Sequence, residues 1–410
     1  MRFHSRFTEI LWTAGYARQE AISDFMMQMQ FVRSMLLGLV AVTAVGAAPA
    51  SANPELLFDV NTGAVIQHQD AFRRWHPASL TKLMTAYTAF RAVQAGELGL
   101  DSPIKISKKA ASFPPAKMGY KPGSVLTLDN ALKIIMVKSA NDVAAAIGEN
   151  VGGSTEAFAV RMNAEARRLG MTGSNWVNAN GLHDPDQYTT ARDLAILVRA
   201  IRLDYPQYAS YFNIEGIVAG KAKLKNFNPL VGRFPGTDGM KTGFVCESGF
   251  NLVASATRDG RTLAAIVLGA DSPKDRAEEA AKLLQGGFGR VGSSVGVTAL
   301  VPYGDNRDMP TNMREEVCSP KAKHAASDGP APTEAGAAAE KASIIPEMSR
   351  PRNWVTVSLG GATGPVPKAY AGREPVEYAD VPLPTWRPDR PAPAGAAPVI
   401  QSTQASKARS

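Results

Sequence analysis

Strand-like segments at both ends of the central part of the chain constrain its fold more than any other feature. Residues 56–60 and 64–68 are joined by a short turn, whose Gly63 suits the positive φ that tight hairpin loops need. Residues 250–257 and 262–268 form a second pair of the same kind, again with glycine in the connection. Two hairpins favour an antiparallel sheet over the alternating strands and helices of a parallel one.

Between the hairpins the periodicity is helical. Apolar residues recur every three or four positions after Ser79 and again after Thr127, whose hydroxyl can cap a helix. The second helix is interrupted near Ser139 and then resumes. Further amphipathic helices are expected over residues 156–169, 191–201 and 273–288. The predicted class is therefore α/β of the α+β type, with an antiparallel sheet flanked by helices and a helical subdomain in the middle of the chain.

The first 52 residues have the pattern of a leader. Residues 34–48 are apolar and small, and Ala50-Ser51-Ala52 has the A-x-A pattern that signal peptidase reads. The apolar run is shorter than the roughly 20 residues of a comfortable membrane span, although a retained anchor is the alternative. We therefore expect cleavage after Ala52 and export to the periplasm or cell envelope. Because a long acidic stretch precedes the run, the true start is expected among Met26, Met27 and Met29.

A change of composition after residue 290 ends the predicted folded domain, residues 53–290. Sixteen of the 28 prolines fall in residues 301–410, among alanine-rich runs. Such a segment buries too little apolar surface to offset the entropy of ordering it. Residues 291–410 are therefore predicted to be a Pro/Ala-rich, largely disordered tail, with local order around Trp354–Leu359.

Composition and spacing argue against several kinds of site. The formal net charge is +8, yet no Lys/Arg run is interleaved with aromatic residues as a nucleic-acid site would require. Cys246 and Cys318 are far apart without CxxC spacing, and the five histidines include no HExxH pair. We therefore expect no nucleic acid among the partners, and no metal or other cofactor.

Three short motifs carry the chemistry. Ser79-Leu80-Thr81-Lys82 opens a predicted helix, Ser139-Ala140-Asn141 lies at the helix interruption, and Lys241-Thr242-Gly243 precedes a predicted strand. Each motif alone is weak, because Ser79 and Ser139 could simply be helix caps and Lys82 a solvated side chain. Their order and contexts together form a specific signal. A G-x-S-x-G match at residues 292–296 lacks the strand-to-helix context of a nucleophile elbow and is interpreted as a linker turn.

The first motif supplies the two groups that an activated nucleophile needs, a hydroxyl and a nearby base. A serine hydroxyl is a poor nucleophile until a base takes its proton. At positions i and i+3 of a helix, Ser79 and Lys82 share one face and can hydrogen-bond. A lysine acts as a base only when burial or a second cation lowers its pKa, and Lys241 is a candidate for that cation. In the first turn of a helix, Ser79 would also present backbone N–H groups to the reacting carbonyl.

The remaining motif residues suit a peptide substrate. Ser139 can relay a proton to the leaving amine, and Asn141 can hold a substrate amide. Lys241 and Thr242 suit a terminal carboxylate. Gly243 has no side chain, so an extended peptide can lie against the strand edge at this point.

These motifs resemble those of the low-molecular-mass penicillin-binding proteins, the serine D-alanyl-D-alanine carboxypeptidases. The resemblance covers about residues 54–290 and is carried by residues 77–85, 180–182, 189–194, 238–244 and 249–256. It implies a β-lactamase/transpeptidase-like fold, with the active site between a helical region and a helix-flanked antiparallel sheet. It also implies removal of the terminal D-alanine from peptidoglycan pentapeptide stems through an acyl-enzyme on Ser79, and acylation of that serine by β-lactam antibiotics.

The resemblance assigns further residues and leaves some questions open. It implies that the backbone N–H groups of Ser79 and Phe244 form the oxyanion hole and that Arg276 helps to bind the substrate carboxylate. Val245 stands where many members have Thr or a similar polar residue. Cys246, close to the site, is either free or paired with Cys318. Since the family's small β-rich second domain and its anchor helix are not recognisable after residue 290, membrane or cell-wall association stays open.

Three alternative functions were weighed against this one. A class A β-lactamase would need a Glu in an E-x-x-L-N setting between Asn141 and Lys241, and no such segment is present. A D,D-endopeptidase that cuts peptidoglycan cross-links would use the same residues. A non-catalytic peptidoglycan-binding wall protein would keep its function in the tail, although every catalytic position of the motifs is intact.

Overall fold

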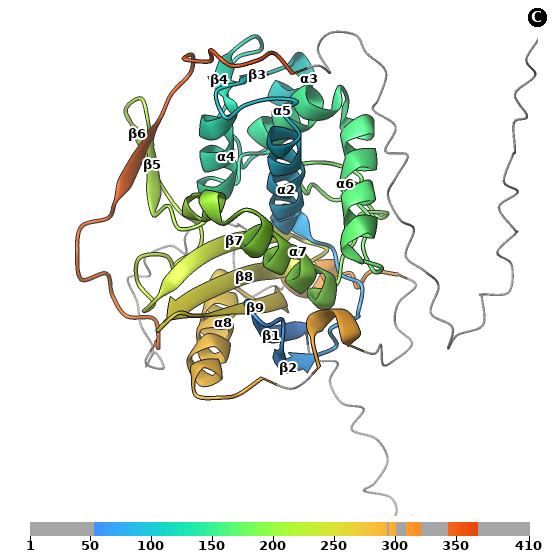
Figure 1. Cartoon of the computed structure of the whole chain (residues 1–410), viewed down its shortest axis with the longest axis vertical. Helices are drawn as coiled ribbons and strands as arrows, with labels where there is room; N and C mark the ends of the chain where they lie inside the picture. Colours follow the sequence, from blue (N-terminus) through green and yellow to red (C-terminus); the bar gives the residue numbers. More distant parts are fainter. Residues whose placement is uncertain (1–52, 293–294, 301–308, 321–342, 368–410) are drawn as a thin grey trace, which may run out of the picture. The chain divides into compact units, whose positions relative to one another are not determined.

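The computed structural model describes residues 53–292, 295–300, 309–320 and 343–367 (Figure 1). The main sheet has five strands in the order β2-β1-β9-β8-β7, and every neighbouring pair is antiparallel. The strands are β1 (Glu55–Asp59), β2 (Val65–Gln69), β7 (Thr237–Val245), β8 (Gly249–Arg258) and β9 (Arg261–Ala270). Both predicted hairpins, β1–β2 and β8–β9, are confirmed, and β7 is an edge strand.

Helices cover both faces of this sheet. β8 and β9 are buried along nearly their whole length, and successive side chains of a strand point to opposite faces, so both faces must be covered. α8 (Pro273–Phe288) packs on β8 and β9, whereas α7 (Ala191–Asp204) packs on β9 and β1 (Figure 1). The two helices match the predicted segments closely.

The middle of the chain forms the predicted helical subdomain. Its elements are α2 (Thr81–Gln94), β3 (Pro103–Lys105), α3 (Lys108–Ser112), β4 (Val125–Thr127), α4 (Leu128–Val137), α5 (Asn141–Gly152) and α6 (Thr155–Leu169). Thr127 caps α4 as predicted, since its hydroxyl accepts a hydrogen bond from the backbone N of Asn130 at 3.1 Å. The predicted interruption near Ser139 is the break between α4 and α5.

The start of α2 differs from the prediction. Ser79 does not lie in the first turn of an α-helix but in a separate 3₁₀ turn, η1 (Ala78–Leu80), directly before α2. Two further 3₁₀ turns are η2 (Pro206–Tyr211) and η3 (Val297–Ala299). Because η1 runs into α2 without a gap, Lys82 in the first turn of α2 remains close to Ser79.

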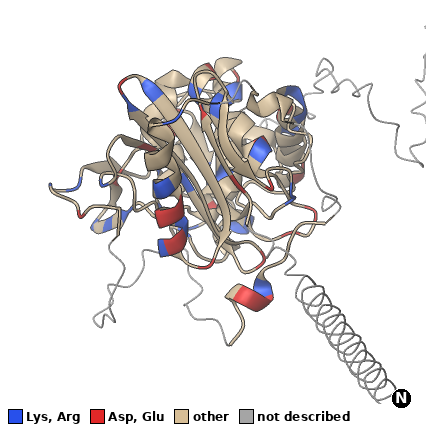
Figure 2. Cartoon of the chain, turned by 90° about the horizontal axis from the view of Figure 1, so that it is seen from below, with Lys and Arg blue, Asp and Glu red and all other residues tan. Residues whose placement is uncertain are grey.

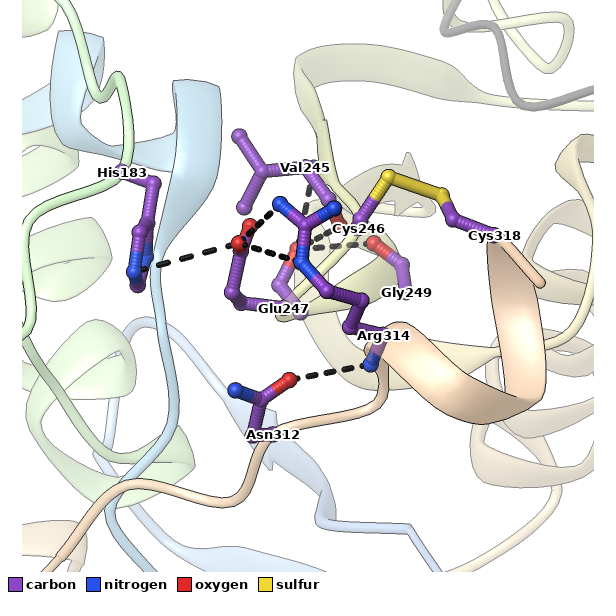
Figure 3. Close-up of a disulfide and its surroundings, with 9 residues drawn as sticks. His183, Val245, Cys246, Glu247, Gly249, Asn312, Arg314 and Cys318 are labelled. Atoms are coloured by element: carbon purple, nitrogen blue, oxygen red, sulfur yellow. Dashed lines mark hydrogen bonds and ion pairs between the residues drawn. A yellow bond between two sulfur atoms is a disulfide. The ribbon is translucent and has the colours of Figure 1, made fainter.

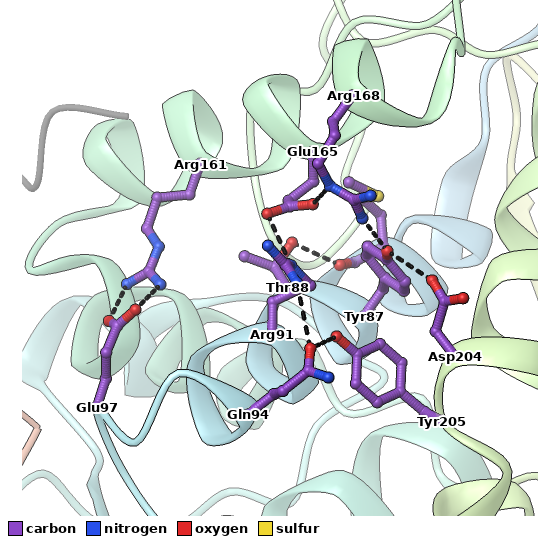
Figure 4. A network of polar contacts seen from close by, with 11 residues as sticks. Tyr87, Thr88, Arg91, Gln94, Glu97, Arg161, Glu165, Arg168, Asp204 and Tyr205 are labelled. Atoms are coloured by element: carbon purple, nitrogen blue, oxygen red, sulfur yellow. Dashed lines mark hydrogen bonds and ion pairs between the residues drawn. The ribbon is translucent and has the colours of Figure 1, made fainter. Parts of the chain in front are cut away.

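A partly buried polar network joins the later part of α2 to its neighbours (Figure 4). Glu165 of α6, which is 5% exposed, binds Arg91 of α2 at 3.1 Å and Arg168 at 2.7 Å. The hydroxyl of Tyr87 accepts a hydrogen bond from Arg168 and donates one to Asp204 of α7 at 3.3 Å. These contacts fix α2, and with it the segment that carries Ser79, against two other helices.

Part of the region after residue 290 is ordered against the domain. β10 (Trp354–Val357) pairs in parallel with β5 (Gly216–Ala219), which pairs antiparallel with β6 (Ala222–Lys225). This strand confirms the local order predicted around Trp354–Leu359. The structure also describes residues 309–320, which contain α9 (Arg314–Val317) and which sequence composition did not distinguish from the rest of the tail.

The described surface carries charges of both signs. Figure 2 shows Lys and Arg interspersed with Asp and Glu on the side of the molecule in view. Within residues 53–292 and the shorter described segments, no helix is both long enough and apolar enough to cross a bilayer. The predicted leader, its cleavage site and the alternative start positions lie outside the described residues.

Candidate active site

The three motifs meet where the helical subdomain faces the edge of the main sheet. Ser79 and Lys82 come from η1 and the start of α2, and Ser139 and Asn141 come from the break between α4 and α5. The third motif, Lys241-Thr242-Gly243, lies in the middle of β7. These segments are separated by about 60 and 100 positions in the sequence, and the structure brings them together as the motif order predicts.

Lys82 links the first two motifs. It is completely buried, and its Nζ donates to Ser79 Oγ at 2.9 Å and to Asn141 Oδ1 at 3.0 Å. It also donates to the backbone carbonyl of Asn180. The side chain is therefore held with its nitrogen against the hydroxyl of Ser79, the geometry that a base needs to take a proton from this oxygen.

Lys241 links the second and third motifs. It is 1% exposed, and its Nζ donates to Ser139 Oγ at 3.0 Å and to the carbonyl of Thr242 at 2.8 Å. The contact between Lys241 and Ser139 crosses from the sheet to the helical subdomain. The hydroxyl of Thr242 is buried and has no hydrogen-bond partner among the residues that the structure describes.

Two glycines bring other segments against the backbone of Ser79. A β-carbon on Gly243 would lie 3.0 Å from Ser79 N and 2.9 Å from Pro77 O, closer than real β-carbons normally approach. A β-carbon on Gly181, whose φ is +83°, would lie 3.0 Å from Ser79 N and still closer to Ala78 O. Glycine is therefore needed at both positions for β7 and the loop at Gly181 to reach Ser79.

Backbone strain occurs directly before Ser79 and at Ser139 itself. Ala78 has a φ of 48° and Ser139 has a φ of 60°, a region that residues with a β-carbon rarely occupy. Such conformations persist where the surrounding structure imposes them, and they are frequent in active sites. Here they orient the backbone just before Ser79 and the side chain of Ser139.

Asn141, for which the sequence predicts a contact with a substrate amide, makes hydrogen bonds to two neighbouring segments. Its Oδ1 accepts from Lys82, and its Nδ2 donates to the carbonyl of Pro114 at 3.0 Å. Both ends of its amide are thus bonded within the protein. Its neighbour Asp142 accepts hydrogen bonds from the backbone N–H groups of Met118 and Gly119, which fixes the loop near Pro114 beside the site.

Arg276 also has an internal role in this structure. It is completely buried, and its Nη1 donates to the carbonyls of Gly243 at 3.2 Å and Asn251 at 3.3 Å. The guanidinium lies 5.6 Å from the ring centre of Phe250, which stacks on Phe244. In this arrangement Arg276 supports the β7–β8 pair on which the third motif lies.

Two asparagines near the site were given no role by the sequence analysis. The backbone carbonyl of Asn180 accepts from Lys82, and the side chain of Asn251 donates to the carbonyls of His76 at 3.0 Å and Pro77 at 3.3 Å. Asn251 thus fixes the segment before Ser79 to β8. A main-chain acceptor cannot be recognised from residue identity, and Asn251 lies within the family-like stretch 249–256 without a motif of its own.

A charged cluster with a disulfide lies beyond the end of β7 (Figure 3). Cys246 is bonded to Cys318, which settles the choice that the sequence left open. Glu247 binds Arg314 of α9, with Nε at 3.0 Å, and His183 Nε2 lies 3.9 Å from the same carboxylate oxygen. Burial alone would raise the pKa of Glu247, but the hydrogen bond from Arg314 and the proximity of His183 hold it below its usual value.

His76 connects this cluster to the nucleophile segment. Its ring packs edge-on against His183 with 4.8 Å between the ring centres, and its Nδ1 lies 3.1 Å from the carbonyl of Gln187. Burial lowers the pKa of His76 below its usual value, so the neutral imidazole is favoured. Across the described ranges, no three His, Cys, Asp or Glu side chains are grouped so that they could hold a metal ion.

Comparisons with known proteins agree with this geometry. A family model described as Peptidase_S11, D-alanyl-D-alanine carboxypeptidase, matches residues 41–272, more than half of the chain. The chain is 35% identical over 268 residues to D-alanyl-D-alanine carboxypeptidase DacC of Escherichia coli, covering 62% of this chain and 67% of that protein. It is 31% identical over 242 residues to D-alanyl-D-alanine carboxypeptidase DacF of Bacillus subtilis, covering 58% and 62%. The matched part thus spans about two thirds of each relative.

Solved structures share the fold. Penicillin binding protein 5 from Haemophilus influenzae is 33% identical with a TM-score of 0.56, over 60% of this chain and 73% of that chain. Penicillin-Binding Protein D2 from Listeria monocytogenes, in an ampicillin-bound form, is 29% identical with a TM-score of 0.54, over 59% of this chain and 100% of that one. The expected transpeptidase-like fold, with an antiparallel sheet, flanking helices and a helical subdomain, is confirmed.

Proposed function

Because the chain belongs to the D-alanyl-D-alanine carboxypeptidase family of low-molecular-mass penicillin-binding proteins, we propose that it removes the terminal D-alanine from peptidoglycan pentapeptide stems. The observation that carries this proposal is the pair of lysine–serine contacts, Lys82 to Ser79 and Lys241 to Ser139. One pair supplies a nucleophile with its base. The other supplies a proton relay beside the position of the leaving group.

Acylation begins at Ser79. Neutral Lys82 takes the proton from Ser79 Oγ, and this oxygen attacks the carbonyl carbon of the penultimate D-alanine. Lys82 is completely buried, so its nitrogen is held beside Ser79 Oγ and away from bulk water. The backbone N–H groups of Ser79 and Phe244 bind the oxyanion, and the close approach of Gly243 to Ser79 N is consistent with this role.

The leaving D-alanine then receives a proton. Collapse of the tetrahedral intermediate breaks the peptide bond. The proton that Lys82 removed from Ser79 passes through Ser139, which Lys241 contacts at 3.0 Å, to the departing amine, so Lys82 is neutral again. Lys241 and the hydroxyl of Thr242 hold the carboxylate of the departing residue. Water then attacks the ester on Ser79 with Lys82 as the base, which releases the shortened stem and restores the free serine.

In this mechanism Asn141 and Arg276, both predicted to contact the substrate, position other groups of the site. Asn141 holds Lys82 against Ser79, since both ends of its amide are bonded within the protein. Arg276 holds the β7–β8 pair through the carbonyls of Gly243 and Asn251, and its charge attracts the substrate carboxylate. Loss of Asn141 is therefore expected to lower the turnover rate more than it weakens substrate binding.

The same serine is proposed to react with β-lactams, and the protein is proposed to act outside the cytoplasm. The Listeria monocytogenes relative was crystallised in ampicillin- and cefotaxime-bound forms. A β-lactam presents a strained carbonyl next to a carboxylate, so Ser79 attacks it while Lys241 and Thr242 hold the carboxylate. The A-x-A pattern that ends at Ala52 supports export to the compartment where peptidoglycan is found.

Release of D-alanine from a synthetic pentapeptide, followed by mass spectrometry, tests this function. The wild-type protein is expected to remove one D-alanine, and Ser79→Ala is expected to lower the rate by about 10⁴-fold or more. Ser154→Ala is the matched control, because Ser154 is an ordinary helix cap that accepts from Ala157 N at 3.0 Å. Undiminished release of D-alanine by the Ser79→Ala protein would refute the assignment.

A further inference from the structure

We propose that Arg314, Glu247 and His183 form a subsite for the charged side chain of the stem-peptide residue that precedes the two D-alanines. This inference rests on the proposed function and deepens it, since it names the kind of stem that the site prefers. The preferred side chain carries both an ammonium and a carboxylate group, as in a diaminopimelate-type stem. A lysine-type stem carries the ammonium alone.

The direction of the substrate follows from two anchors on β7. Its terminal carboxylate is held at Lys241 and Thr242, and its scissile carbonyl lies at Ser79, against which Gly243 is packed. β7 is the edge strand of the main sheet, so its outer edge can pair with an extended peptide. A peptide with its carboxyl end at Thr242 therefore runs antiparallel to β7, and its preceding residues extend toward Val245.

The residue before the two D-alanines reaches the end of the strand. A strand advances about 3.4 Å per residue, so one residue beyond the scissile position lies beside Val245 and the turn that follows. That turn contains Cys246 and Glu247 and is closed by a hydrogen bond from Ser248 N to Val245 O at 3.0 Å. A long side chain in this position is within reach of the cluster of Figure 3 when it projects past the turn.

The cluster offers one group for each end of a zwitterionic side chain. Arg314 uses Nε and Nη2 to bind Glu247, while its Nη1 makes no hydrogen bond to any residue that the structure describes. The Arg314 side chain is 58% exposed, so Nη1 can receive a carboxylate from solvent, with His183 beside it. Both bonds from Arg314 end on one oxygen of Glu247, so this carboxylate, whose side chain is 5% exposed, keeps acceptor capacity for an ammonium group at its exposed edge.

The position of Arg314 is fixed by several contacts rather than by one ion pair. Cys318 binds Cys246 at the start of the turn, and Met313 N donates to the carbonyl of Glu247 at 3.0 Å. Asn312 accepts from the backbone N of Arg314 at 3.0 Å, which starts the short helix (Figure 3). The segment around Arg314, distant in sequence, is thus bound to the end of β7, along which the substrate is proposed to lie.

The test compares two pentapeptides that differ only in the third residue, diaminopimelate in one and lysine in the other. The full-length protein with its disulfide intact is expected to favour the diaminopimelate peptide in kcat/KM. Arg314→Gln is expected to reduce this preference about tenfold, mainly by slowing the diaminopimelate peptide, while Arg314→Glu reverses it. Arg314→Lys should keep part of the preference. Acylation by a simple penicillin, which has no such side chain, should stay within about twofold of wild type in all three variants.

Arg350→Gln is the matched control. Arg350 also lies after residue 290, is 48% exposed and binds a buried carboxylate, that of Glu215, but it belongs to the β5–β10 region. Its loss should leave the preference unchanged. An unaltered preference in Arg314→Gln and Arg314→Glu, or a wild-type protein that does not favour the diaminopimelate peptide, would overturn the proposed subsite. A wild-type protein that releases D-alanine from neither peptide would instead overturn the proposed function, and the subsite with it.

Discussion

The basic side chains at the two ends of α2 have different kinds of hydrogen-bond partner. At its start, Lys82 is completely buried and donates to Ser79, Asn141 and Asn180, all through neutral oxygens. Toward its end, Arg91 meets the carboxylate of Glu165, which also binds Arg168 (Figure 4). A carboxylate partner keeps a basic group protonated, whereas neutral acceptors leave it able to lose its proton. One end of the helix is therefore arranged for proton transfer and the other for holding helices together.

Lys82→Met removes the basic group at the start of α2 and has the largest expected effect of the changes that test this comparison. Methionine has a similar shape but cannot accept a proton, so acylation by penicillin should slow by about 1000-fold. Replacing a buried basic group by an apolar one need not destabilise the fold, so Tm should stay equal or rise. Stopped-flow labelling measures the acylation rate, and a thermal melt of the same sample measures Tm. Lys109→Met, at a side chain that is 56% exposed, is the control and should change neither.

Ser139→Ala tests the second lysine–serine contact. Removing the relay oxygen 3.0 Å from Lys241 should slow acylation by about 100-fold, less than the loss of the base, because water can replace part of a relay. The rate of penicillin labelling measures the effect. Ser107→Ala removes a serine that only caps α3 and should leave that rate unchanged. Equal rates for the two variants would argue that Ser139 has no part in proton transfer.

Glu165→Gln removes the shared carboxylate at the other end of α2. It should lower the free energy of unfolding without changing the rate of acylation. Arg91 and Arg168 lose their shared carboxylate, and because their side chains are 37% and 32% exposed, water compensates in part. We expect a loss of about 2 kcal/mol in the free energy of unfolding, or about 6 °C in Tm. Penicillin labelling per folded molecule should stay within about twofold. Glu156→Gln, at an exposed ion pair with Lys109, should leave Tm nearly unchanged.

Replacement of His76 is expected to give the smallest effect, which is a change in how Tm depends on pH. Burial lowers its pKa below the usual 6.5, with His183 acting in the same direction and Glu247 and Asp184 opposing it. The unfolded chain therefore binds more protons than the folded one below pH 6.5, so this contribution to stability is present above that pH and is lost as the pH falls. From pH 7.5 to 5.5, Tm of the wild type should fall a few degrees more than that of His76→Gln. A fall of equal size in both proteins would contradict this.

The sequence predicted the parts of the fold that rest on local patterns. β8 and β9 are long apolar runs, and α4, α7 and α8 carry apolar spacing together with recognisable caps. The meeting of the three motifs was likewise predictable, because their fixed order singles out Ser79, Lys82 and Lys241 as the proposed catalytic set. Nothing in that prediction required knowledge of which segments touch.

What the sequence could not predict depends on contacts between distant segments. Composition placed residues 309–320 in a disordered tail, but a disulfide to Cys246 and the burial of Met313 hold them on the domain. The internal roles of Asn141 and Arg276 come from main-chain carbonyls, which residue identity does not reveal. Ser79 was placed one turn too far into α2, since a 3₁₀ turn and the start of an α-helix share the same apolar spacing.

The most direct test of the account is the site at which a penicillin becomes attached. The wild-type protein is incubated with the antibiotic, digested with a protease and examined by tandem mass spectrometry. We predict a single adduct, on Ser79, whose formation is lost in Ser79→Ala and strongly slowed in Lys82→Met. An adduct on another residue, or undiminished labelling of the Ser79→Ala protein, would contradict the assignment of Ser79 as a nucleophile activated by Lys82.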